Sequence, residues 1–115
     1  IPKNHSVMFG SLSGSKIGAW VAHGEGKFGF PYEEKEYHII AKYNYEGYPA
    51  NPNGSPWAVA GVCSQDGRHL AMMPHLERSL HPWNWGYYAE DRNGDEVSPW
   101  IEAFVNARLW IEEHK

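Results

Sequence analysis

The stretch WAVAGVCSQDGRHLAMM, from Trp57 to Met73, decides the fold of this chain. Asp66-Gly67 is a favoured two-residue β-hairpin turn, and apolar runs flank it on both sides. Closing the turn between Gln65 and Arg68 predicts a register of Cys63 with Leu70, Val62 with Ala71 and Gly61 with Met72. Both arms are apolar on both faces, so we expect other parts of the chain to cover the hairpin on both sides.

The segments before the hairpin predict two more strands. The uncharged run from Ile17 to Ala22 predicts a short buried strand that ends at a glycine-rich loop. A looser alternation from Tyr37 to Tyr45 predicts a second strand. Three prolines between Tyr48 and Pro56 predict a stiff connection that is neither helix nor strand.

The end of the chain predicts a helix. We expect Ser98 to be its N-cap and Pro99 to take the first helical position, where the missing N–H costs nothing. The core-facing side is expected to consist of Trp100, Ala103, Phe104, Ala107, Trp110 and Ile111.

The composition is that of one globular domain. Of the 115 residues 42% are hydrophobic and 21% are charged, which excludes disordered and collagen-like classes. No membrane partner is expected, because the longest uncharged apolar run is far shorter than the roughly 20 residues of a membrane-spanning helix. No nucleic-acid partner is expected either, because the net charge is −4 and the ten basic residues are scattered.

Two further features bear on the setting of the chain. The single cysteine cannot form an internal disulfide, which is compatible with a reducing compartment. The first residue is Ile and no signal-like segment precedes it, so we expect the chain to begin inside a longer protein.

His75 and Glu77 are the first candidates for chemistry, and they follow the predicted hairpin directly. Side chains two residues apart project to the same side of an extended backbone but to nearly opposite sides of a helix. The two groups can therefore touch only if this segment is extended or turned, which Pro74 favours. A carboxylate beside an imidazole fixes its tautomer and raises its basicity, as in the base and orienting members of a catalytic triad. An ordinary surface ion pair has the same spacing.

Cys63 looks at first like a nucleophile on a strand-to-helix elbow. Such an elbow carries a second glycine just past the nucleophile and leads into a helix, whereas Ser64 to Gly67 returns into a strand. We therefore expect Cys63 to be a small buried core residue and the catalytic thiol to lie elsewhere.

Three other groups leave alternatives open. His23-Gly24-Glu25-Gly26 either approaches a ligand or forms a plain tight turn. The aromatic stretch from Trp83 to Tyr88 either stacks against a sugar or fills a core or an interface. Four residues have side chains that could bind a metal: His69, His75, Glu77 and His81. No metal is expected, because their spacings match no common zinc pattern.

Five segments in order resemble the glutamine amidotransferase domain at the C-terminal end of phosphoribosylformylglycinamidine synthase. They are Ala22-His23-Gly24-Glu25-Gly26, Tyr48 to Pro56, Met72 to Arg78, His81 to Gly86, and Pro99-Trp100 through Asn106-Ala107-Arg108. The resemblance implies an α/β fold: part of a three-layer class I glutamine amidotransferase-like (flavodoxin-like) domain. Its sheet would be mixed and largely parallel, with a β-hairpin and a C-terminal helix.

The resemblance also implies roles for particular residues. His75 matches the histidine and Glu77 the glutamate of a Cys-His-Glu triad that hydrolyses glutamine, with Leu76 where the family has proline. The family's nucleophilic cysteine lies upstream of the His-Gly-Glu-Gly loop, so residues 1–115 are expected to be the C-terminal portion of the domain and inactive alone. Two roles are open for a further set of residues: they either line the glutamine pocket or contact a synthetase domain. The set consists of His23, Glu25, Asn51, Asn53 and Ser55.

For the complete enzyme, the resemblance implies delivery of ammonia to a synthetase domain of the same polypeptide. That domain would use ATP and Mg²⁺ to amidate formylglycinamide ribonucleotide in the cytoplasm, and no cofactor is expected in residues 1–115. The truncated face is expected to expose apolar surface and to support self-association. An aromatic sugar-binding module and a small non-catalytic interaction domain remain alternative interpretations.

Overall fold

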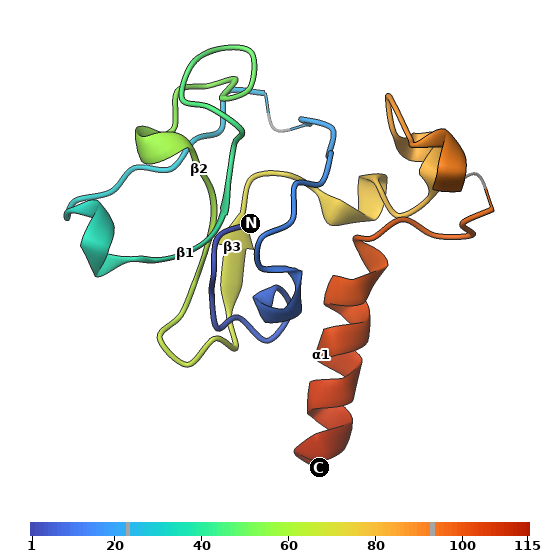
Figure 1. The fold of residues 1–115 in the computed structure, drawn as a ribbon. Helices are drawn as coiled ribbons and strands as arrows, with labels where there is room; N and C mark the ends of the chain where they lie inside the picture. Colours follow the sequence, from blue (N-terminus) through green and yellow to red (C-terminus); the bar gives the residue numbers. More distant parts are fainter. Residues whose placement is uncertain (23, 93) are drawn as a thin grey trace.

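The computed structural model describes residues 1–22, 24–92 and 94–115, and in these it contains a three-stranded antiparallel sheet and one α-helix (Figure 1). The strands are β1 (His38–Lys42), β2 (Val59–Cys63) and β3 (Leu70–Met72), in the sheet order β1-β2-β3. The helix α1 spans Ile101–Glu113. The described residues also form six short 3₁₀ turns: η1 (Gly10–Leu12), η2 (Glu34–Glu36), η3 (Pro56–Ala58), η4 (Leu76–Arg78), η5 (Pro82–Asn84) and η6 (Glu90–Arg92).

The predicted hairpin is confirmed in position and register. β2 and β3 pair antiparallel, with Gly61 opposite Met72, Val62 opposite Ala71 and Cys63 opposite Leu70. Gly67 adopts a φ of 72°, which favours glycine, and its carbonyl accepts a 2.8 Å hydrogen bond from the Val7 N–H. The turn therefore also ties the N-terminal segment to the sheet.

The expectation that other parts of the chain cover both faces of the hairpin is correct for the central strand β2 and wrong for the edge strand β3. Val59 is fully buried and Ala60 is 4% exposed, so neighbouring side chains enclose both faces of β2. Ala71, on the edge strand β3, is exposed. The strand predicted between Tyr37 and Tyr45 is also confirmed, as β1.

The strand predicted from Ile17 to Ala22 is wrong, because these residues have no strand structure. The segment instead runs beside residues 79–87, held by side chains rather than by a backbone ladder. The Trp20 Nε1–H donates to the Asn84 carbonyl, and the Trp100 Nε1–H donates to the Gly18 carbonyl at 2.7 Å. Trp20 remains 55% exposed and Val21 46% exposed, so the run is not buried either.

The sheet also differs from the mixed, largely parallel arrangement that the resemblance implied. Both strand pairs formed by the described residues are antiparallel. For β2 and β3 the reason is local, because the short Asp66-Gly67 hairpin turn joins only antiparallel neighbours and a parallel pair needs a longer crossover.

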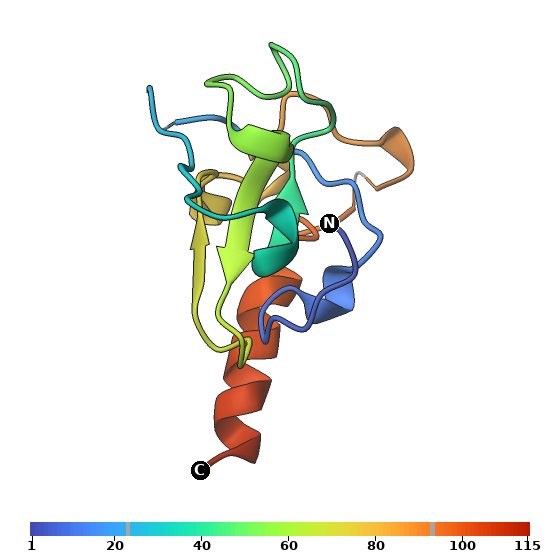
Figure 2. The same cartoon turned by 90° about the vertical axis from the view of Figure 1, so that its left-hand side faces the viewer.

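The core lies where the sheet, the N-terminal segment and the start of α1 meet. The turn η1 lies beside the first half of α1 in both views (Figures 1 and 2), and the Asn106 side chain donates a 3.0 Å hydrogen bond to the Met8 carbonyl. The buried apolar cluster consists of Phe9, Leu12, Ile40, Ala41, Ala60, Leu76, Trp100 and Ala103. None of the helices among the described residues is long and apolar enough to cross a membrane.

The predicted helix is present but begins at Ile101 rather than at Pro99. A tighter turn comes first, because the Ile101 N–H bonds the Ser98 carbonyl at 3.1 Å. The Ser98 hydroxyl donates to the Ser79 carbonyl at 2.5 Å and accepts only a long 3.4 Å bond from the Trp100 N–H. The N-cap group is thus engaged mainly in a tertiary contact.

The predicted core-facing side of the helix is correct in part, since Ala107 and Trp110 are half-buried. Trp100 is 4% exposed and Ala103 fully buried, whereas Phe104 is 40% exposed and Ile111 56% exposed. The second half of α1 extends past the strands (Figure 1), and there the Arg68 guanidinium of the hairpin turn lies over the Trp110 ring, 4.8 Å from its centroid. An apolar surface remains open along this helix.

Candidate functional site

His75 and Glu77 meet directly. His75 Nδ1 lies 2.8 Å from Glu77 Oε1, and the side chains are 46% and 60% exposed. An ionised carboxylate only accepts hydrogen bonds, so Nδ1 carries the proton and donates it. In the neutral ring Nε2 is then the free acceptor, and it is available to a group from outside this segment.

The residue between them holds the pair in place. Leu76 is 5% exposed and belongs to the buried cluster, while its two neighbours face solvent. The 3₁₀ turn η4 places these residues, with the Arg78 N–H bonding the His75 carbonyl at 3.2 Å. A buried leucine thus anchors a turn whose flanking side chains carry the polar groups.

The electrostatics of Glu77 favour its ionised form. Its pKa lies below the ordinary value of 4.5, first because its own backbone N–H bonds the carboxylate and then because the His75 imidazole does. At neutral pH the carboxylate is therefore available to orient His75 and to stabilise an imidazolium.

The loop containing Asn51, Asn53 and Ser55 has a structural role. The Asn51 side chain accepts a 3.0 Å bond from the Ser55 N–H and donates a 2.8 Å bond to the Ser55 carbonyl. Both residues are buried, at 4% and 5% exposed. Asn53 donates to the carbonyls of Gly24 and Gly26 at 2.6 and 2.9 Å, which joins this loop to the glycine-rich loop.

The structure describes only one of the two remaining predicted pocket residues, Glu25 and His23. Glu25 is exposed at the surface of the glycine-rich loop. His23 lies outside the described residues. The structure therefore brings Asn51, Asn53 and Ser55 together with the backbone around Glu25, as a braced pair of loops.

The topology puts these loops and His75 at the same end of the sheet. β2 is antiparallel to both neighbours, so the β1–β2 connection and the end of β3 both lie at the end where β2 begins. Figure 1 shows the loop between β1 and β2 and the chain leaving β3 on the side opposite the hairpin turn. This end of the molecule carries the segments that the sequence indicated as functional.

Cys63 has the properties of a structural residue. It is free and half-buried, and it packs against the core cluster. Burial, and then the negative charge of Asp66, raise the pKa of its thiol. A thiol with a raised pKa is a poor nucleophile at neutral pH.

The metal alternative finds no support in the described part of the chain, where no three His, Cys, Asp or Glu side chains are grouped so as to hold an ion. His69 is 3.9 Å from Asp66, and His81 lies flat against the Trp83 ring with centroids 4.4 Å apart. Each histidine of the proposed set thus has a different neighbour.

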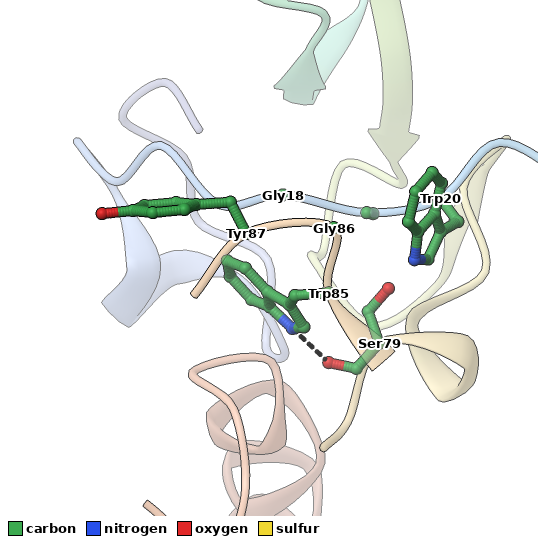
Figure 3. A pocket seen from close by; sticks show the side chains of 7 residues that line it. Gly18, Trp20, Ser79, Trp85, Gly86 and Tyr87 are labelled. Carbon is green, nitrogen blue, oxygen red and sulfur yellow. Dashed lines mark hydrogen bonds between the residues drawn. The ribbon is translucent and has the colours of Figure 1, made fainter. Parts of the chain in front are cut away.

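The aromatic stretch forms part of a cavity of about 400 Å³ (Figure 3). Trp85 donates through Nε1 to the Ser79 carbonyl at 2.9 Å, which fixes the position of its ring in the cavity wall. Trp83 and Tyr87 are 74% and 78% exposed. Sequence reasoning missed Ser79, a 1% exposed residue in a stretch without periodicity, and no pattern in the sequence singles it out.

Comparison with known proteins adds independent information. Residues 1–111 match a family model described as a CobB/CobQ-like glutamine amidotransferase domain. The chain is 41% identical over 120 residues to a human protein named phosphoribosylformylglycinamidine synthase, an alignment that covers 94% of this chain and 9% of that protein.

Two further relatives carry similar names. A Drosophila melanogaster phosphoribosylformylglycinamidine synthase is 43% identical over 96% of this chain and 9% of its own length. An Arabidopsis thaliana protein named probable phosphoribosylformylglycinamidine synthase, chloroplastic/mitochondrial, is 41% identical over 97% and 9%. The chain thus spans less than a tenth of the length of these relatives.

Proposed function

The chain belongs to the CobB/CobQ-like glutamine amidotransferase family, and from this premise we propose that His75 and Glu77 are the base and orienting residues of a glutamine-hydrolysing site. The site would belong to a phosphoribosylformylglycinamidine synthase, the name its relatives carry. The observation that carries the proposal is the 2.8 Å contact between two exposed side chains on a turn anchored by a buried leucine.

The chemistry is an acyl transfer in two steps. A thiolate attacks the carboxamide carbon of glutamine, a C–S bond forms and the C–N bond breaks, and the His75 imidazolium gives its proton to the departing ammonia. Water then attacks the thioester carbon while His75 Nε2 takes its proton: the C–O bond forms, the C–S bond breaks, glutamate is released, and the thiolate and the His75 imidazolium are restored. Glu77 holds the ring through Nδ1 and offsets the positive charge whenever the imidazolium forms.

The nucleophile in this proposal is a cysteine outside residues 1–115. Cys63 is unsuited because burial and Asp66 raise its pKa. His75 and Glu77 are 46% and 60% exposed, so their polar groups face outward, where a second segment can reach them. We place the nucleophilic elbow on a preceding segment of the longer polypeptide, which would also complete the three-layer class I architecture.

The exposed apolar side chains support an interface with that segment. Along α1, Val105 is 46% and Leu109 49% exposed, and on the segment before the glycine-rich loop Trp20 is 55% exposed. Apolar groups of this number on so small a chain are typical of surfaces that another element covers. When expressed alone, the chain should satisfy them by self-association.

The activity of the whole protein is part of the same proposal. Ammonia from the glutaminase site would pass to a synthetase domain of the same polypeptide, which would use ATP and Mg²⁺ to amidate formylglycinamide ribonucleotide. The described residues offer no donor set for Mg²⁺, so we derive no step through the metal in this chain. We propose the cytoplasm as its location, whereas the name of the Arabidopsis relative places that protein in the chloroplast or mitochondrion.

Complementation tests the proposal. The 115-residue chain is assayed for glutamate release from glutamine, alone and after joining to the part of an amidotransferase domain that carries the elbow cysteine. We expect no turnover from the chain alone and turnover from the joined protein. Robust hydrolysis by the chain alone would refute the assignment of the nucleophile to another segment, and its loss in a Cys63→Ala variant would identify Cys63 as the nucleophile.

A further inference from the structure

The cavity beside the aromatic stretch has features of a ligand site that the proposed glutaminase chemistry does not use. Two segments far apart in sequence form it, residues 18–20 and residues 79–87. Its volume of about 400 Å³ lies within the range of small-molecule pockets. The residues that define its shape are Gly18, Trp20, Ser79, Trp85, Gly86 and Tyr87.

A buried hydroxyl without a partner points into this cavity. Ser79 is 1% exposed, and its Oγ makes no hydrogen bond to any residue that the structure describes. The Ser79 carbonyl is satisfied twice, by the Trp85 Nε1–H at 2.9 Å and by the Ser98 hydroxyl at 2.5 Å. Figure 3 shows the hydroxyl turned toward Trp20, away from the carbonyl oxygen that binds Trp85. Buried polar groups are nearly always paired, so this one calls for a partner.

The walls around the hydroxyl are flat and uncharged. A Cβ on Gly86 would lie 3.2 Å from the Trp20 ring, and a Cβ on Gly18 would lie 3.5 Å from the Trp85 ring. Glycine at both positions therefore lets backbone and indole form smooth surfaces. Aromatic ligands stack or pack edge-to-face on such surfaces.

The chemistry of the lining restricts the ligand. None of the described lining residues carries a charge, so a zwitterion or an anion would lose its hydration without gaining a counter-ion. That excludes glutamine itself from this cavity. One hydroxyl offers one hydrogen bond in either direction, which matches a ring with a single N–H or O–H group.

We infer that this cavity binds a neutral aromatic ring bearing one hydrogen-bonding group, of the size of indole or phenol, through Ser79 Oγ and the faces of Trp20 and Trp85. The ring can come from a free small molecule or from a Trp or Tyr side chain on another polypeptide segment. The site is separate from the His75–Glu77 pair in its residues and in its chemistry, so the two assignments succeed or fail independently.

A thermodynamic cycle of two ligands and two proteins, the 115-residue chain and one variant, tests the inference. Binding of indole and of 1-methylindole, which lacks the N–H, is measured by calorimetry for the wild type and for Ser79→Ala. We expect saturable binding of indole to the wild type, with 1-methylindole roughly three- to tenfold weaker because one hydrogen bond is lost. In Ser79→Ala, which removes an unpartnered hydroxyl, the affinity for indole should fall to that for 1-methylindole.

Two controls locate the site and its natural source. Trp83→Ala, in the same aromatic stretch but outside the cavity lining, should leave indole binding unchanged. N-acetyl-tryptophanamide as probe separates the sources: its binding assigns the cavity to a side chain on a backbone, and its failure beside bound indole assigns it to a free small molecule.

Three results would overturn the inference. The first is the absence of saturable indole binding by the wild type. The second is a preference for indole over 1-methylindole that persists in Ser79→Ala. The third is loss of binding in Trp83→Ala, which would move the site to the exposed His81–Trp83 stack. The comparison of the two ligands on the wild type needs no variant, so the test stands even if Ser79→Ala folds poorly.

Discussion

Replacing Leu76 by alanine should destabilise the chain strongly, because this side chain anchors the turn that carries His75 and Glu77. Leu76 is 5% exposed within the buried cluster. Truncation removes three carbon groups worth about 0.8 kcal/mol each, or about 2.4 kcal/mol in transfer free energy. The cavity left behind adds roughly 0.5–1 kcal/mol, which gives a loss of about 3 kcal/mol in the free energy of unfolding.

Urea unfolding followed by tryptophan fluorescence measures this loss, and Leu109→Ala is the matched control. Leu109 is the same residue type but is 49% exposed on α1, so its truncation should cost less than about 1 kcal/mol. In a chain of this size the Leu76 variant should also melt roughly 12 °C lower. Equal effects of the two substitutions would refute the anchoring role of Leu76.

Three further predictions concern single positions. Gly67→Ala should destabilise the hairpin, because φ is 72° and the new Cβ would lie 2.4 Å from the His5 carbonyl oxygen; a variant that unfolds at the wild-type urea concentration would contradict this. The pKa of Glu77 is lowered in the folded chain, so this group stabilises the fold above its unfolded pKa near 4.5 and the contribution is lost as the pH falls through the folded value. His75→Ala should raise the Glu77 pKa only part of the way to its ordinary value, because the hydrogen bond from the Glu77 backbone N–H remains. The measurement is the pH titration of the Glu77 carboxyl ¹³C shift. A full return to the ordinary pKa would show that His75, and not the backbone N–H, is the main cause of the lowered value. Cys63 should react with iodoacetamide at pH 7 more slowly than a free thiol, because burial and Asp66 raise its pKa; alkylation at the rate of glutathione would show that the thiol is not shielded.

The parts of the fold that the sequence predicts well are those controlled by neighbouring residues. The hairpin register follows from the turn chemistry of Asp66-Gly67, and β1 follows from local alternation. The segment from Ile17 to Ala22 was predicted wrongly because a strand needs a pairing partner, and here indole N–H groups bind the nearby carbonyls instead. The late start of α1 has a similar cause, since the Ser98 hydroxyl binds the Ser79 carbonyl.

In the candidate site, too, the sequence predicts the contacts between near neighbours and misses those that depend on how the chain folds. The contact between His75 and Glu77 follows from their spacing after a strand, and the structure has it at 2.8 Å. Sequence spacing does not predict that Asn51 and Ser55 are buried or that the Asn51 side chain forms two hydrogen bonds with the Ser55 backbone, because both depend on how the loop closes. Nor does it indicate Ser79, whose importance depends on burial and on a missing partner.

In the proposed mechanism His75, oriented by Glu77, moves the protons of glutamine hydrolysis for a cysteine on another segment. The most direct measurement is the glutaminase kcat of the joined protein in His75→Ala, Glu77→Gln and His69→Ala, the last being an exposed histidine outside the pair. We expect the first substitution to lower kcat by about 10²- to 10⁴-fold, the second by a smaller factor and the third not at all. Unchanged turnover in His75→Ala, with the variant folded, would contradict the account.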